Sequence, residues 1–269
     1  MKKLLKQIWI SMQCRTGVDL KNVINAFSFV SPGKYRELKK DLRELKKQSA
    51  SAEKTFPLDR LYPCYFDKND NAGSACGAYY WQDFFVAQRI FSNKPDKHLD
   101  VGSSISGFVT HVACFRQIEV LDIRPLEQKI PNVTFRQCDI MRKENLQAEI
   151  TDSISSLHAL EHFGLGRYGD PICYDGYLIG FDNITYLLKP GGKFYFSVPL
   201  GQQRIEFHAH RVFSLSYLLE MVSNDYTIDS FSYVDDKGNF FPEEEISQTL
   251  IENNCNCSFG CAIFELTKN

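Results

Sequence analysis

The sequence lacks the long apolar runs and the repeats that would place it in several large classes. No stretch of its 269 residues approaches the ~20 consecutive apolar residues of a membrane span. No internal repeat is evident. The opening residues, 1–6, are lysine- and leucine-rich, but Lys6 and Gln7 interrupt the apolar character and no small-residue cleavage site follows, unlike in a signal peptide. We therefore expect a cytoplasmic protein.

The sequence also lacks a recognisable disulfide or zinc pattern. Its nine cysteines are an odd number and are scattered through strand-like stretches, which favours reduced, buried thiols. The only cluster is Cys255, Cys257 and Cys261, whose spacing matches no common zinc knuckle and has no histidine nearby. A disulfide scaffold and a structural zinc site are both disfavoured.

Charge is distributed unevenly between two parts of the chain. Residues 1–55 hold thirteen Lys/Arg against five Asp/Glu, whereas residues 56–269 hold eighteen against twenty-eight. Tyr35, Leu38, Leu42 and Leu45 recur at helical spacing among charged residues. We predict a basic helical N-terminal extension over 1–55 and one main domain over 56–269. The extension could dock on its own domain, self-associate, or lie peripherally on the inner face of a membrane. The acidic main domain makes a nucleic-acid partner unexpected.

Strand-like and helix-like runs alternate along the main domain. Such alternation predicts an α/β fold with a mainly parallel sheet covered by helices. The predicted strands cover 97–101, 118–123, 133–138, 152–157, 193–198, 227–234 and 261–266, and the predicted helices 79–91, 176–188 and 214–223. Only a polar, acidic segment separates the last two strands, which fits a terminal antiparallel hairpin.

The strongest local signal is the loop that follows the first of these strands. Asp100 ends the strand, and Gly102 and Gly107 bracket a turn that opens a helix. A phosphate-binding P-loop is excluded because Phe108 follows Gly107 where a lysine is required. A dinucleotide fold is disfavoured because Ser104 replaces its middle glycine. S-adenosylmethionine (SAM) has no pyrophosphate, so a Gly-x4-Gly loop suits it better.

Two further acidic residues stand at the ends of the next strands. Asp122 lies 22 positions after Asp100, where a carboxylate can accept the ribose hydroxyls of a nucleoside. Asp139 ends the third strand, and its natural use is the adenine amino group. A single acid at a strand end often only caps the next helix. Three acids in register behind a glycine loop favour a nucleoside site.

This order of motifs resembles the class I SAM-dependent methyltransferases over roughly residues 78–268. The most typical segment is 187–192, Leu-Leu-Lys-Pro-Gly-Gly, before the fifth strand. The resemblance implies a Rossmann-like, seven-stranded, mostly parallel sheet with a reversed last hairpin, and SAM as the cofactor. The residues it implies for SAM are Asp100, Gly102, Ser103, Ser104, Gly107, Asp122, Ile123, Asp139, Ile140 and Leu157.

Histidines and acids gather after the fourth and fifth strands, where the methyl acceptor is expected. His158, Glu161 and His162 follow Leu157, and His210 and Arg211 follow the fifth strand. Either His162 or His210 could act as general base toward an acceptor hydroxyl. Some methyltransferases bind a divalent metal with a similar pattern, which makes Glu161, His162 and His210 metal candidates. A purely structural role for this cluster is the remaining alternative.

Residues 157–171 and 209–211 resemble a narrower, poorly characterised methyltransferase-like group that is associated with bacterial surface-glycan synthesis. That resemblance implies O-methylation of a sugar, nucleotide-sugar or lipid-linked glycan. Arg204 and Arg211 could hold a phosphate of such an acceptor, with 164–176 as a mobile covering loop and Tyr79 to Asp83 as an opposite wall. The alternative is a non-catalytic binding or scaffold protein of the same fold.

Overall fold

The computed structural model describes residues 32–51, 56–58, 60–64, 73 and 75–269 of the chain. The chain divides into two compact units, Met1–Ser74 and Ala75–Asn269. The division at residue 55 that charge predicts stays a prediction. Within the described residues, no helix combines the length and the apolar character needed to cross a membrane.

One long helix lies within the predicted N-terminal extension. Helix α3 spans Pro32–Ala50, with proline at the first helical position, where its missing N–H is not needed. None of its residues is buried, and Tyr35 and Leu45 are among the exposed apolar side chains. This confirms the helix predicted from the apolar spacing. The helical face predicted around Leu5 to Met12 lies outside the described residues.

The second unit is built around one eight-stranded sheet in the order β3-β2-β1-β4-β5-β10-β8-β9. Its strands are β1 (His98–Val101), β2 (Ile118–Asp122), β3 (Val133–Gln137), β4 (Thr151–Leu157), β5 (Leu188–Leu200), β8 (Tyr226–Val234), β9 (Phe240–Phe241) and β10 (Gly260–Lys268). Strands β1 to β5 run parallel, and β10 is antiparallel to both neighbours, β5 and β8. All seven predicted strands are present.

The prediction of seven strands is wrong by one short strand. β9 has only two residues, and its pairing places Phe241 opposite Tyr233, with the two rings stacked at 4.5 Å. Aromatic cross-strand pairs of this kind stabilise a sheet edge, but a two-residue strand leaves no periodic signal in the sequence. A separate two-stranded ribbon, β6 (Arg204–Glu206) with β7 (His210–Val212), was also not predicted.

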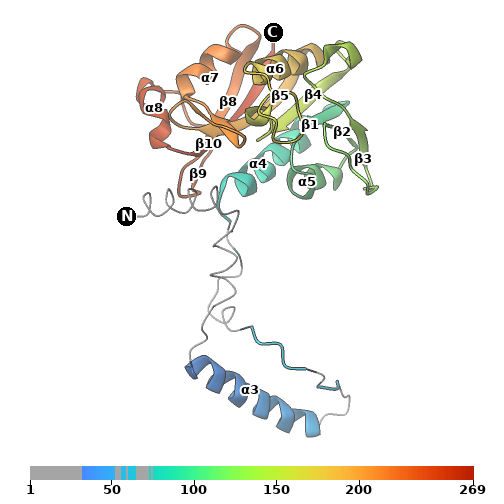
Figure 1. Cartoon of the computed structure of the whole chain (residues 1–269), viewed down its shortest axis with the longest axis vertical. Helices are drawn as coiled ribbons and strands as arrows, with labels where there is room; N and C mark the ends of the chain where they lie inside the picture. The colour runs from blue at the N-terminus through green and yellow to red at the C-terminus, as the bar shows by residue number, and fades with distance from the viewer. Residues whose placement is uncertain (1–31, 52–55, 59, 65–72, 74) are drawn as a thin grey trace. The chain divides into compact units, whose positions relative to one another are not determined.

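Helices cover both faces of the sheet, as Figure 1 shows. The helices of this unit are α4 (Ala78–Asn93), α5 (Thr110–Ala113), α6 (Gly176–Leu187), α7 (Leu215–Val222) and α8 (Gln248–Asn253), with short turns η2 (Ile105–Val109), η3 (Lys143–Asn145), η4 (Leu160–His162) and η5 (Asn254–Asn256). α4 and α5 contribute to one apolar core, whereas α6 and α7 contribute to the other. The three predicted helices are confirmed as α4, α6 and α7.

Strand β4 is polar in sequence yet buried on both faces. Its serines form hydrogen bonds with neighbouring polar groups. Ser153 Oγ lies 2.8 Å from His98 Nδ1, and Ser156 Oγ donates to the Val101 carbonyl over 3.0 Å. Buried hydroxyls with such partners cost little. Because β1 pairs with both β2 and β4, the sheet order reverses between β1 and β4. In open α/β sheets, the crevice beyond this reversal is where ligands bind.

Candidate functional site

The Asp100 side chain supports the loop after β1 through hydrogen bonds. This residue is fully buried, and its carboxylate accepts hydrogen bonds from Ser103 N (3.0 Å), Ser103 Oγ (2.6 Å) and Ser155 Oγ (2.6 Å). Burial raises the pKa of Asp100 to about 7, although these hydrogen bonds oppose the rise. Asp100 does not line the cavities described below. In this structure the Asp100 side chain shapes the loop, and its predicted contact with a cofactor stays a prediction.

The two glycines of this loop have different neighbours. Gly102 has φ +72°, and a Cβ there would lie 3.0 Å from the Cβ of Ala159. A Cβ on Gly107 would lie only 2.3 Å from Asp83 Oδ2 of α4. Gly107 therefore allows α4 to approach the loop, and it does not line the cleft. Burial raises the pKa of this Asp83 carboxyl to about 6.

A cavity opens beyond the carboxyl ends of β1, β2 and β3. The cavity itself is small, about 60 Å³, and the adjoining second cavity described below, about 540 Å³, lies within the range of small-molecule sites. The lining residues include Gly102, Leu121, Asp122, Ile123, Cys138, Asp139, Ile140, Met141, Ala159 and Phe163. Apolar walls with two carboxylates at strand ends suit a nucleoside. Four of the predicted cofactor residues beyond Gly102 line it: Asp122, Ile123, Asp139 and Ile140.

Arg124 engages the Asp122 carboxylate at the mouth of this cavity. Its Nε donates to Asp122 Oδ1 (3.0 Å) and its Nη2 to Oδ2 (2.6 Å). The Arg124 guanidinium also lies 4.4 Å from the ring centre of Tyr168, in the loop after β4. Asp139 is less constrained, since Oδ1 accepts from Met141 N (3.0 Å) and Oδ2 lies 3.3 Å from Arg142 Nε.

Two further cavities adjoin the first, and His158 and His162 line all three. The second is lined by Tyr79 and by three more of the predicted cofactor residues, Ser103, Ser104 and Leu157. The third, here called the acceptor cavity, is lined by Tyr79, His158, Glu161, His162, Arg167, His210, Asp235, Asp236 and Phe259. The three form one cleft that leads from the nucleoside end, past the two histidines, to the β6–β7 ribbon.

His158 and Glu161 form an ion pair where the cavities meet. His158 Nδ1 lies 2.8 Å from Glu161 Oε1, and its ring packs on Tyr79 at 5.1 Å. Burial opposes charge on His158, but the neighbouring Cys261 and Glu161 outweigh it and hold the His158 pKa well above its ordinary value. Burial also opposes charge on Glu161, yet His158 keeps the Glu161 pKa below its usual range. His158 is therefore an imidazolium near neutral pH and is unsuited to act as a base.

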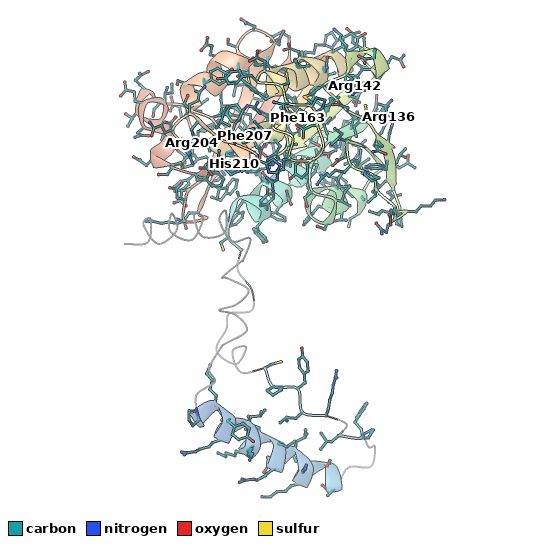
Figure 2. All side chains as sticks on the ribbon, viewed as in Figure 1. Arg136, Arg142, Phe163, Arg204, Phe207 and His210 are labelled. Atoms are coloured by element: carbon teal, nitrogen blue, oxygen red, sulfur yellow. The ribbon has the colours of Figure 1, made fainter. Side chains whose placement is uncertain are left out.

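His162 and His210 have the opposite electrostatic character. Burial lowers the pKa of both rings, in spite of the Glu161 carboxylate near them. His162 Nδ1 donates to the Ala209 carbonyl over 2.6 Å, which leaves the lone pair on Nε2. His210 Nε2 lies 3.3 Å from Glu206 Oε2. Figure 2 shows His210 grouped with Arg204 and Phe207 on the β6–β7 ribbon. Both rings are neutral near pH 7 and suited to accept a proton.

Arg211 lies below the acceptor cavity and does not line it. Its guanidinium donates to the carbonyls of Phe163 (2.6 Å) and Tyr174 (2.8 Å) and stacks 4.7 Å from the ring of Tyr177. Only 4% of the residue is exposed. In this structure Arg211 bonds the loop after β4, and its predicted catalytic or phosphate-binding role stays a prediction. Arg204 is similarly engaged, by Glu206 and backbone carbonyls.

The metal prediction gains no support from this geometry. In the part of the chain that the structure describes, no group of three or more His, Cys, Asp or Glu side chains is arranged to hold a metal ion. Glu161 is instead paired with His158, and His210 with Glu206. The cluster is a hydrogen-bonded acid–base site.

Sequence reasoning missed several residues that line the cleft, and Arg124 and Tyr168 are two of them. Arg124 stands two positions after Asp122, close enough to fold back on it, and this spacing was the available signal. Tyr168 lies in the glycine-rich loop predicted to be mobile. The structure instead anchors that loop through Asp170, which accepts from Gly166 N and Tyr168 N over 3.1 Å each.

A family model described as "Caenorhabditis protein of unknown function, DUF268" matches residues 115–256, just over half of the chain. No protein of curated function is similar in sequence. Many solved structures are similar in fold. One is the Burkholderia thailandensis 1,6-didemethyltoxoflavin-N1-methyltransferase with bound 1,6-didemethyltoxoflavin and S-adenosylhomocysteine (SAH), with 14% identity and TM-score 0.51 over 90% of this chain and 92% of that chain.

Two other structures are similar at comparable identity. The [4+2]-cyclase SpnF has 15% identity and TM-score 0.52, over 73% of this chain and 85% of its own. The N-methyltransferase NodS from Bradyrhizobium japonicum WM9, in complex with SAH, has 13% identity and TM-score 0.48, over 87% and 98%. The likeness to the Burkholderia thailandensis enzyme shows that the second unit has the α/β, Rossmann-like fold of a SAM-dependent methyltransferase.

Proposed function

This chain belongs to the DUF268 family, and from its fold and its cleft we propose that it is a SAM-dependent methyltransferase. One observation carries the proposal: a cleft at the reversal of the sheet has one end lined by the strand-end carboxylates Asp122 and Asp139, and another end lined by His162 and His210. Such a pairing is what transfer from a nucleoside-bearing cofactor to a proton-bearing acceptor requires.

The residues present fit SAM. Asp122 would accept the ribose hydroxyls and Asp139 the adenine amino group, while Ile123 and Ile140 would pack on the ring. One adjustment is needed, because Arg124 must release Asp122. Its side chain is 48% exposed and can turn outward. SAM, when bound, supplies a methyl group on a sulfonium, which needs no metal to be electrophilic.

The protein's own residues would orient the acceptor and take up its proton. His162 is the favoured base, because its Nδ1 hydrogen bond to Ala209 leaves Nε2 as the proton acceptor and because it lines both the cofactor and the acceptor cavities. His210, on the far wall of the acceptor cavity, is the second candidate. The proton of an acceptor hydroxyl would pass to one of these neutral imidazoles.

We propose a sugar or glycan hydroxyl as the acceptor, free or carried by a nucleotide or lipid. The aromatic rings of Tyr79 and Phe259 line the acceptor cavity beside polar groups, a combination that suits a sugar ring. The resemblance of residues 157–171 to a group associated with surface-glycan synthesis supports the same class.

Calorimetric titration of the full chain with SAM and SAH tests the proposed activity. We expect one site with a micromolar Kd for SAH, weakened at least tenfold by Asp139→Ala and unchanged by Asp229→Ala, which lies on β8 away from the cleft. The absence of binding to both ligands at millimolar concentration would contradict an enzymatic function.

That outcome would favour a second candidate, a binding or scaffold protein that has kept the fold without the cofactor. This second candidate is supported by the Asp122 carboxylate, because Arg124 already donates hydrogen bonds to both of its oxygens.

A further inference from the structure

Two buried polar atoms of the acceptor cavity have no hydrogen-bond partner among the described residues: His158 Nε2 and Glu161 Oε2. The side chains of His158 and Glu161 are only 7% and 1% exposed. Buried polar atoms in folded proteins are nearly always hydrogen-bonded. Two exceptions on neighbouring side chains of one cavity indicate that a ligand supplies the missing partners.

The His158–Glu161 pair offers one donor and one acceptor. His158 Nδ1 donates to Glu161 Oε1, and because the ring is protonated, its Nε2 carries a second, unused hydrogen. Cys261 lies close enough to raise the pKa of His158, but the hydrogen bonds of its thiol go to Gln82 Oε1 (3.7 Å) and the Ala262 carbonyl (3.6 Å). Glu161 Oε2 remains as the unused acceptor.

The other charged groups of the cavity are engaged within the protein. Asp235 accepts from Lys237 N and Asn239 N, and Asp236 accepts from Ser258 N and Phe259 N. Arg167 donates to the Ala209 carbonyl over 3.1 Å. The ion pair, with no net charge, is the part of the wall whose polar atoms lack hydrogen-bond partners.

We propose that the His158–Glu161 ion pair binds an uncharged hydroxyl group of the methyl acceptor, which it selects over amine and phosphate groups. A hydroxyl both accepts and donates, so it can take the His158 Nε2 hydrogen and give its own to Glu161 Oε2. An ammonium group has only donors, which leaves His158 unpartnered and adds like charge beside it. A phosphate offers acceptors but no donor for Glu161 Oε2, and it adds negative charge beside that carboxylate.

The backbone conformation and the hydrogen bonds of the His158 N–H fix the position of this residue. His158 has φ +51°, a conformation that is uncommon outside glycine, and its N–H is held by the carbonyl (3.0 Å) and Oγ (3.2 Å) of Ser197. Ser197 Oγ in turn donates to Gln82 Oε1 of α4 over 2.7 Å. The ring is thus fixed before a ligand arrives, so His158 and Glu161 act as positioning and specificity residues, while the base is a different histidine.

The proposal rests on the proposed methyl transfer and deepens it, so its test measures cofactor and acceptor binding on the same samples. The full chain, saturated with SAH, is titrated with methyl glucoside, glucosamine and glucose 6-phosphate by saturation-transfer difference NMR. We expect the wild type to bind methyl glucoside about tenfold more tightly than the other two. Glu161→Gln should lose about tenfold for methyl glucoside, with SAH affinity unchanged.

Glu220→Gln is the matched control, because Glu220 is exposed on α7 and lines none of the cavities; it should bind like the wild type. Equal or tighter binding of glucosamine or glucose 6-phosphate, unchanged binding by a folded Glu161→Gln, or no binding of any sugar by the SAH-loaded wild type would each overturn the proposal. The comparison of the three sugars on the wild type tests the proposal even if Glu161→Gln does not fold. Failure of SAH binding itself would refute the methyltransferase function instead.

Discussion

The Arg124 guanidinium holds both carboxylate oxygens of Asp122, at 3.0 Å and 2.6 Å, at the mouth of the nucleoside cavity. The contact joins the loop after β2 to the loop after β4, since Arg124 also stacks on Tyr168. The carboxylate best placed for a ribose is thus occupied by a side chain that is itself half exposed. Any nucleoside that uses Asp122 has to displace this arginine.

Arg124→Ala should therefore tighten SAH binding. A half-exposed ion pair contributes about 0.2–1 kcal/mol, so removing the competition should lower the Kd by about 1.5- to 5-fold. Calorimetry measures the change, and Arg136→Ala on β3 is the control, because Arg136 has a similar exposure but pairs with Glu119 at 3.8 Å. Weaker binding by Arg124→Ala would show that the guanidinium contacts the cofactor.

His162→Ala should abolish methyl transfer without loss of the cofactor. Loss of a general base slows proton transfer by about 10²–10⁴-fold, while the residues around the nucleoside remain in place. SAH release in the presence of a sugar or glycan acceptor gives the rate, and calorimetry gives the SAH affinity. His208→Ala, in the turn between β6 and β7, serves as the control, because His208 lines none of the three cavities. A parallel fall of rate and SAH affinity would assign His162 a structural role.

The burial of Asp100 predicts a pH-dependent stability. Its folded pKa of about 7 lies above the unfolded value near 3.8, so the folded state binds the proton more tightly. The stabilisation is complete below the unfolded pKa and declines as the pH rises through the folded pKa. Urea unfolding of wild type and Asp100→Asn should show a stability difference that shifts against the wild type between about pH 4 and pH 7. A difference independent of pH would contradict a protonated Asp100.

Gly107→Ala should destabilise the fold through a clash with Asp83. The new Cβ would lie 2.3 Å from Asp83 Oδ2, and overpacking of this kind costs about 1–3 kcal/mol. Asp83→Ala removes the clashing atom, so the double variant should lose less stability than the two single changes added together. Simple additivity in urea unfolding would show that the two residues do not compete for space.

The sequence predicted the sheet and the place of the site because both depend on local patterns. The alternation of strands and helices, the Gly102 loop, and acids at the ends of β2 and β3 are readable without tertiary contacts. The roles of individual residues were harder to predict from the sequence. Asp100 and Gly107 carry the motif but face protein, because the loop needs support from Ser155 and space beside Asp83.

Arginines were the hardest residues to interpret. An arginine near a site binds carboxylates, phosphates or backbone carbonyls with the same fork of donors. Arg211 meets carbonyls from the loop after β4, far away in sequence, and Arg124 turns back on Asp122. The state of the histidines also required the fold, since His158 becomes an imidazolium through Glu161 and His162 stays neutral through burial.

A crystal structure of the full chain with SAH would test the proposed cofactor site. We predict electron density for the adenosine in the cavity beyond β1, β2 and β3, with the ribose hydroxyls on Asp122, the amino group near Asp139, and Arg124 turned away from its present position. The sulfur should face His158 and His162. Density elsewhere, or none from crystals at saturating SAH with Arg124 still bound to Asp122, would contradict it.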